Sequence, residues 1–112
     1  EPVAAELAAA HATPEQCGAM VGAVVQMAVH AKSGDLEAYL RADQLFHATL
    51  LAASGNEMLA VLGDVVGELR PCGSGAAAVR LHGDVAEAVQ SGDRSAATIM
   101  ATLLTRRPRA DP

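Results

Sequence analysis

The sequence contains very few aromatic residues: no tryptophan, one tyrosine and one phenylalanine among its 112 residues. This scarcity argues against a β-sandwich or β-barrel, because such folds depend on aromatic and β-branched side chains. Alanine occurs 25 times and leucine 12 times, and both favour helices, which can pack closely around small side chains. We therefore expect one all-α domain over residues 1–112, an antiparallel bundle of about six helices.

Basic residues and cysteines are also scarce. Eight Lys and Arg stand against thirteen Asp and Glu, which leaves a net charge of −5. Affinity for nucleic acid comes largely from basic side chains that neutralise phosphates, so this chain alone is not expected to bind DNA.

Cys17 and Cys72 are too few for a disulfide framework and indicate free thiols of a cytoplasmic protein. No apolar run reaches the roughly 18 residues of a membrane span, so no membrane partner is expected.

Glycine and capping residues divide the chain into helical segments. A Ser-Gly-Asp or Ser-Gly-Asn triplet occurs three times, at residues 33–35, 54–56 and 91–93. In such a triplet glycine ends one helix in the left-handed conformation, and the Asp or Asn caps the next. Thr13-Pro14-Glu15-Gln16 is typical of a helix start with a capping box. These helix-start and helix-end signals predict helices over residues 2–12, 14–33, 36–54, 57–70, 76–91 and 94–107, with a loop at 71–75.

Three ionisable residues fall on helix faces that otherwise carry apolar side chains. Asp43 and His47, four residues apart, lie in the middle of the apolar face of helix 36–54, which also carries Leu36, Leu40 and Leu50 and has Phe46 at its edge. His82 falls among the valines and alanines on the inner face of helix 76–91. Burying an unpaired carboxylate or imidazole costs several kcal/mol, so these three groups must have partners.

Two interpretations of these polar residues remain open. A carboxylate and imidazoles on one helical face provide half of a metal site, which a divalent metal would complete. Alternatively, Asp43 and His47 form a hydrogen-bonded pair inside a purely structural helical dimerisation module that binds no ligand. Leu45 points away from both residues and is a candidate for a subunit interface.

The sequence shows no enzyme signature. It has no glycine-rich phosphate loop, no nucleophile elbow and no cysteine with a local acid–base partner. A metal-dependent hydrolase would need a general base beyond the candidate ligands, and none is placed for that role. We therefore expect a protein without catalytic residues.

Several of these residues resemble a known family. Asp43-Gln44-Leu45-Phe46-His47, followed by Ala53-Ser54-Gly55-Asn56 and Leu59, is similar to the central signature of the FCD domain. This domain is the all-helical, effector-binding C-terminal part of FadR-type regulators in the GntR family. The segment from Glu1 to Glu15, and His82 with Gly92-Asp93, resemble the start and end of the same domain.

The resemblance implies a ligand-sensing and dimerisation domain of a bacterial transcriptional regulator. In many relatives an Asp and three histidines bind a divalent metal, often zinc, together with a small organic acid. Asp43, His47 and His82 match three of these ligands, whereas the fourth position is occupied by Leu104, and the loss of one imidazole should weaken metal binding. The resemblance also implies a homodimer and an effector site near the three ligands. The family's winged helix–turn–helix domain does not occur in these residues, so we expect an isolated domain or a piece of a longer regulator that reaches DNA through that domain.

Overall fold

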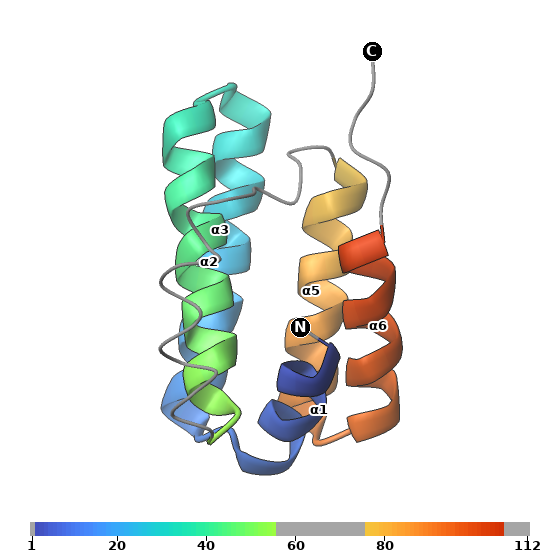
Figure 1. The fold of residues 1–112 in the computed structure, drawn as a ribbon. Coiled ribbons are helices and arrows are strands. Elements are labelled where there is room, and N and C mark those ends of the chain that lie inside the picture. Colours follow the sequence, from blue (N-terminus) through green and yellow to red (C-terminus); the bar gives the residue numbers. More distant parts are fainter. Residues whose placement is uncertain (1, 56–75, 107–112) are drawn as a thin grey trace.

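Five α-helices account for nearly all of the chain that the computed structural model describes, residues 2–55 and 76–106 (Figure 1). Their bounds are α1 Pro2–His11, α2 Pro14–Ser33, α3 Leu36–Ala53, α5 Ala76–Ser91 and α6 Arg94–Arg106. No strand occurs within these two ranges. The all-α prediction is confirmed, as are five of the predicted helices. The predicted helix over 57–70 and the loop at 71–75 lie outside the described residues.

Capping interactions hold the helix ends where the sequence places them. The Thr13 hydroxyl accepts a hydrogen bond from the Gln16 backbone N–H at 3.1 Å, and the Gln16 side chain accepts one from the Thr13 N–H at 3.0 Å. Asp35 and Asp93 cap α3 and α6 through their carboxylates. The three triplet glycines have positive φ, which glycine adopts without steric cost: Gly34, Gly55 and Gly92.

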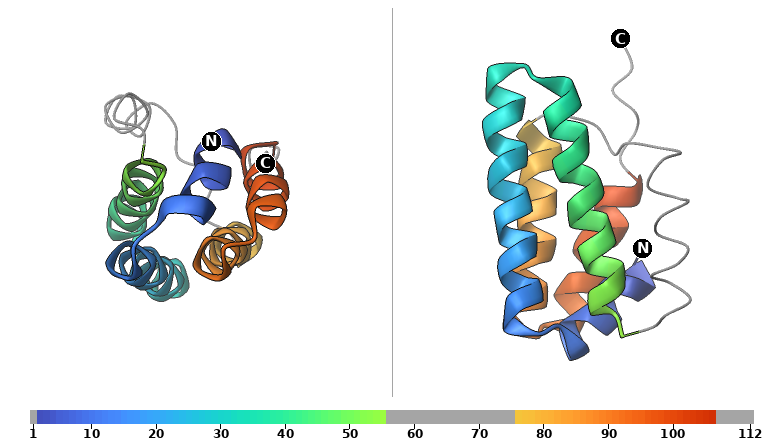
Figure 2. Two further views of the ribbon diagram at one scale, coloured as in Figure 1. Left: turned by 90° about the horizontal axis from the view of Figure 1, so that it is seen from below. Right: turned by 90° about the vertical axis from the view of Figure 1, so that its left-hand side faces the viewer.

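The helices form two antiparallel pairs with α1 against both. Figures 1 and 2 show α2 beside α3 and α5 beside α6, each pair joined by a short turn. The two pairs meet through α2 and α5, and α1 contacts α3, α5 and α6 at one end of the bundle. The predicted antiparallel packing of sequential helices is therefore confirmed for these two pairs.

The core is built mainly from alanine, with a few larger side chains between the alanine layers. Tyr39, Phe46, Met20 and Met27 are each at most 1 % exposed. The helical pattern predicts Leu36 on this inner face, but that prediction is wrong, because Leu36 is 57 % exposed. It is the first residue of α3, at the α2–α3 turn, which lies at the end of the bundle remote from α1 (Figure 1).

Polar groups inside this alanine-rich core are few. Among the described residues the buried polar or charged ones are Asp43, Ser54 and His82. The Ser54 hydroxyl donates to the Leu51 carbonyl within its own helix end, at 2.6 Å, so its burial has a local explanation. The two remaining buried polar residues, Asp43 and His82, have no such local explanation and therefore stand out.

None of the described helices is both long enough and apolar enough to cross a membrane.

Candidate metal centre

Helix α3 supplies two of the three converging side chains, and α5 supplies the third. Asp43 and His47 are one helical turn apart, so both project from the same face of α3. His82 faces them from α5 and is completely buried. The Asp43 side chain is 4 % exposed and that of His47 is 13 % exposed. His47 therefore lies on the side of the cluster nearest to solvent.

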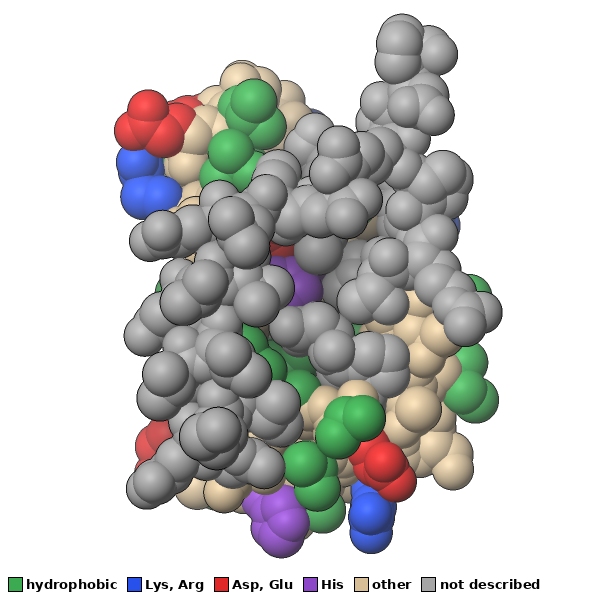
Figure 3. Space-filling model, in the orientation of Figure 1, with side chains coloured by type: hydrophobic (Ala, Val, Ile, Leu, Met, Phe, Trp, Pro, Cys, Tyr) green, Lys and Arg blue, Asp and Glu red, His purple; other side chains and the backbone are tan. Residues whose placement is uncertain are grey.

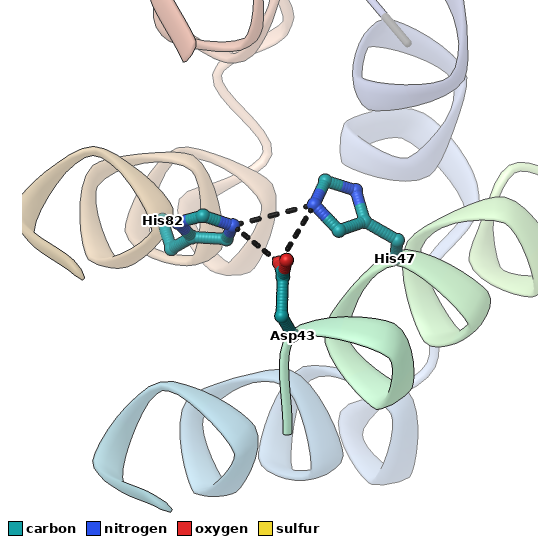
Figure 4. A group of neighbouring side chains, drawn as sticks. All are labelled: Asp43, His47 and His82. Carbon is teal, nitrogen blue, oxygen red and sulfur yellow. Dashed lines mark hydrogen bonds and ion pairs between the residues drawn. The ribbon is translucent and has the colours of Figure 1, made fainter. Parts of the chain in front are cut away.

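Each of the three side chains places one potential metal-ligand atom close to the other two (Figure 4). The Oδ1 atom of Asp43 lies 2.9 Å from Nε2 of His82 and 3.1 Å from Nε2 of His47. The two Nε2 atoms are 3.3 Å apart. The structure thus brings together Asp43, His47 and His82, as the sequence predicts, and the pairing of Asp43 extends to both histidines.

The two histidines keep Asp43 ionised. Burial raises the pKa of this carboxyl group, because the charged form loses solvation. Hydrogen bonds from His47 and His82, together with the charge of their rings, outweigh burial and hold the pKa of Asp43 well below its usual range. The cluster therefore contains a buried negative charge that needs positive charge nearby.

The backbone of α5 fixes the protonation of His82. Its Nδ1 atom lies 2.7 Å from the carbonyl oxygen of Ala78. A carbonyl oxygen only accepts hydrogen bonds, so Nδ1 carries the proton. In a neutral imidazole the other nitrogen, Nε2, then has only a lone pair, and this lone pair points at the Asp43 carboxylate. That contact is repulsive unless a second proton or a metal ion lies at Nε2.

The donor set and its spacing fit a divalent metal. Ligand atoms about 2.1 Å from one ion lie about 3.0 Å apart at octahedral angles and about 3.4 Å apart at tetrahedral angles. The three observed separations, 2.9, 3.1 and 3.3 Å, are close to this range. The hydrogen bond from His82 Nδ1 to a backbone carbonyl is the outer interaction that orients metal-binding histidines in general. Asp43, His47 and His82 could therefore hold a metal ion.

An aromatic ring packs against the cluster. The ring of Phe46, which is fully buried, meets the rings of His47 and His82 edge to face at centroid distances of 5.4 and 4.9 Å. Such contacts restrict the orientation of both imidazoles. In Figure 3 histidine atoms are visible near the centre of the face that is drawn.

The other two histidines of the chain lie apart from the cluster. His30 pairs with Gln26 on the outside of α2, at 3.1 Å, and His11 is exposed at the end of α1. Leu104, the fourth position that the family resemblance implies, belongs to α6. Its side chain lies outside the described residues, so the assignment of that position stays a prediction.

Two contributors to the site do not follow directly from the sequence pattern. The carbonyl of Ala78 is a backbone group that carries no residue-type signal, although its position four residues before His82 is the spacing at which such bonds form within a helix. Phe46 is predicted at the edge of the apolar face, whereas it is completely buried against both imidazoles. The contact with Ala78 is made within α5, whereas the contact of Phe46 with His82 depends on how α3 and α5 are placed in the bundle.

Comparison with protein families gives one match: the family model of the FCD domain matches residues 1–106. Neither a curated protein nor a solved structure matches the chain. The matched range includes both helices that supply the three converging side chains.

Proposed function

Because the chain belongs to the FCD domain family of GntR-type transcriptional regulators, we propose that it senses a small organic acid through a divalent metal. The metal, zinc by preference, would be held by Asp43, His47 and His82. We further propose that residues 1–112 form one sensing and dimerisation unit, which acts on DNA through a separate DNA-binding domain. FCD domains belong to transcription regulators rather than to enzymes.

The position of the His82 imidazole between the Ala78 carbonyl and the Asp43 carboxylate is the single observation that carries the metal proposal. Its Nδ1–H donates a hydrogen bond to the Ala78 carbonyl. Its Nε2 atom lies close to a carboxylate oxygen of Asp43 and to Nε2 of His47. A metal ion at this point would accept the lone pairs of all three atoms and neutralise the Asp43 charge. The preorganised, buried arrangement would require little rearrangement on binding.

The organic acid follows from the number of protein ligands. When bound, a metal with three protein ligands offers open coordination positions that a carboxylate can occupy. Leucine at the fourth family position provides no additional donor there, which leaves more of the coordination shell to the effector. His47, the most exposed of the three side chains, marks the side from which the acid would enter. An effector that binds one arrangement of the dimer more tightly than another would shift the equilibrium between the two arrangements, by the difference between its binding free energies.

Metal content and ligand-induced stabilisation test this proposal together. The chain should be purified without chelator or nickel resin and analysed for zinc, manganese, iron and nickel. We expect close to one equivalent of one divalent metal, and less than about 0.1 equivalent, unchanged by added zinc, would reject the metal proposal. A panel of di- and tricarboxylates should then raise the melting temperature, since an acid at 100 times its Kd adds about 2.7 kcal/mol.

A metal-free structural module is the second candidate function. It is favoured by the distance of 2.9 Å between Asp43 and His82, which suits a hydrogen bond if His82 carries two protons. In this alternative the cluster only stabilises the bundle, and no metal or organic acid shifts the melting temperature. A His82→Gln variant separates the two cases: it would abolish metal-induced stabilisation in the sensor, whereas in the structural module no metal-induced shift exists to be lost.

A further inference from the structure

The outer face of α2 carries no charge over most of its length. Glu15 and Lys32, near the two ends of the helix, are its only charged residues. Val25 and Val29 are each 53 % exposed. Between the two charges the exposed residues are Gly18, Ala19, Val21, Gly22, Val25, Gln26, Ala28 and Val29. A surface helix normally places polar and charged residues on its outer face, so an apolar outer face of this length is suited to being covered.

Six exposed residues on this face follow the spacing of a helix–helix contact. They alternate at intervals of three and four residues, the a/d spacing with which two helices pack side by side. We call them the α2 seam: Glu15, Gly18, Gly22, Val25, Val29 and Lys32. Within the chain α2 packs against α3 and α5 on its other side, and Figure 2 shows it at the edge of the bundle.

The seam is complementary to itself when two copies pack antiparallel. A two-fold axis midway between Gly22 and Val25 places each of these residues opposite the other one in the second copy. The same axis places Gly18 opposite Val29 of the partner subunit. Each glycine thus provides a gap for a valine, which is the small-against-large packing of close helix contacts. A parallel arrangement would instead place glycine against glycine and valine against valine.

Charge favours the same orientation. The antiparallel arrangement places Glu15 opposite Lys32 of the partner subunit, and symmetry repeats the pair at the other end of the seam. A parallel arrangement would bring Glu15 against Glu15 of the partner subunit. Exposed ion pairs add little affinity, so these charges select the orientation while the apolar seam supplies the stability.

In the part of the chain that the structure describes, neither a close contact nor a special backbone conformation requires glycine at the two seam positions. A Cβ atom added to Gly18 or Gly22 would meet nothing within 4 Å. Neither residue has positive φ. Glycine in the middle of a helix destabilises it relative to alanine, so glycine at both positions has a physical reason only if another backbone or side chain approaches there.

A groove widens the apolar surface beside the seam. It lies between α2 and α5, has a volume of about 260 Å³, and is lined in part by Val21, Val25, Gly83 and Ala86. On the α5 side its lining combines the small residues Gly83 and Ala86 with the polar Glu87 and Gln90. A second helix seated on the seam would cover this groove as well.

We propose that a second copy of this chain covers the α2 seam, with the two α2 helices antiparallel. This inference rests on the dimerisation part of the proposed function and names its surface. It is independent of the metal centre, because Val25 points outward whereas Asp43, His47 and His82 lie inside the bundle.

Sedimentation equilibrium of the 112-residue chain tests the surface. The wild-type chain should be a dimer, and Val25→Lys should raise the dimer Kd by about 100-fold, because it places two lysines beside the two-fold axis. Ile99→Lys is the matched control, since Ile99 is 55 % exposed but lies on α6, and it should leave the Kd unchanged. A wild-type chain that is monomeric at about 100 µM, or a Val25→Lys chain that dimerises like wild type, overturns the proposal.

Further variants test the antiparallel register. Glu15→Lys and Lys32→Glu should each weaken the dimer several-fold, and the double variant should recover most of the loss. Gly22→Leu should raise the Kd at least about 10-fold without loss of helicity, since a Cβ atom at this position meets none of the described residues within 4 Å, whereas the leucine side chain would occupy the gap that the seam offers to the partner. A double variant no better than the single ones refutes the register. Zinc binding by Val25→Lys should equal that of wild type, so failure of the metal proposal would be recognised separately.

Discussion

The substitution Asp43→Asn should destabilise the metal-free protein more than any surface change of the same type. The substitution keeps the side-chain shape but removes the negative charge that accepts from His47 at 3.1 Å and from His82 at 2.9 Å. Hydrogen bonds to a charged group contribute about 1.5–3 kcal/mol each. Breaking a buried charged pair costs about 3–5 kcal/mol. Both estimates predict a loss of about 3–5 kcal/mol, a large fraction of the stability of a small domain.

The stability lost on Asp43→Asn should decrease as the pH falls. The contacts hold the pKa of Asp43 below its usual range, so the unfolded chain takes up a proton at higher pH than the folded chain. The stabilisation is therefore complete above the ordinary Asp pKa of about 3.9, and it is lost as the pH falls below that value. The difference between wild type and Asp43→Asn should therefore be fully developed at pH 6 and should shrink toward pH 3.

Urea denaturation in EDTA, followed by circular dichroism at pH 6 and at several lower values, measures this difference. Asp84→Asn is the control, because Asp84 belongs to the polar side of α5 and makes no part of the cluster. We expect the control to change the free energy of unfolding by less than about 0.5 kcal/mol. A loss below about 1 kcal/mol for Asp43→Asn at pH 6 would refute the reasoning that the carboxylate is held by two charged hydrogen bonds.

Three further predictions concern the metal and the helix ends. Leu104→His should raise zinc affinity at least about 10-fold in isothermal titration calorimetry, because it adds an imidazole at the fourth family position; no gain would show that residue 104 does not face the cluster. Zinc affinity should fall steeply between about pH 7.5 and 5.5, since protons compete for the nitrogens of His47 and His82; a flat profile would exclude histidine ligation. Thr13→Ala should cost about 1 kcal/mol, measured by urea denaturation, through loss of the capping bond to the Gln16 N–H. An unchanged midpoint would show that this bond contributes nothing to stability.

Local rules predict much of the fold from the sequence. The Ser-Gly-Asp triplets and the capping box at Thr13 define helix ends to within a few residues, because caps act between neighbours in the chain. The inward positions of Asp43 and His82 follow from helical periodicity alone. Each of these features depends on residues within one or two helical turns.

The remaining features depend on how helices cross. His82 meets Asp43 from a helix 39 residues away in sequence, and no local pattern specifies that the two will touch. Leu36 follows the inner periodicity of α3 but is exposed, because the α2–α3 turn lies at the far end of the bundle from α1. The outward face of α2 is a similar case: its apolar pattern becomes informative only once α3 and α5 are seen to occupy the opposite side.

A crystal structure of protein purified with its metal, with anomalous diffraction measured at the zinc edge, tests the central claim most directly. We expect one anomalous peak about 2.1 Å from each of Asp43 Oδ1, His47 Nε2 and His82 Nε2, with His82 Nδ1 still donating to the Ala78 carbonyl. Crystals soaked in millimolar zinc that show no peak there, while the two imidazoles remain hydrogen-bonded to Asp43, would contradict the claim.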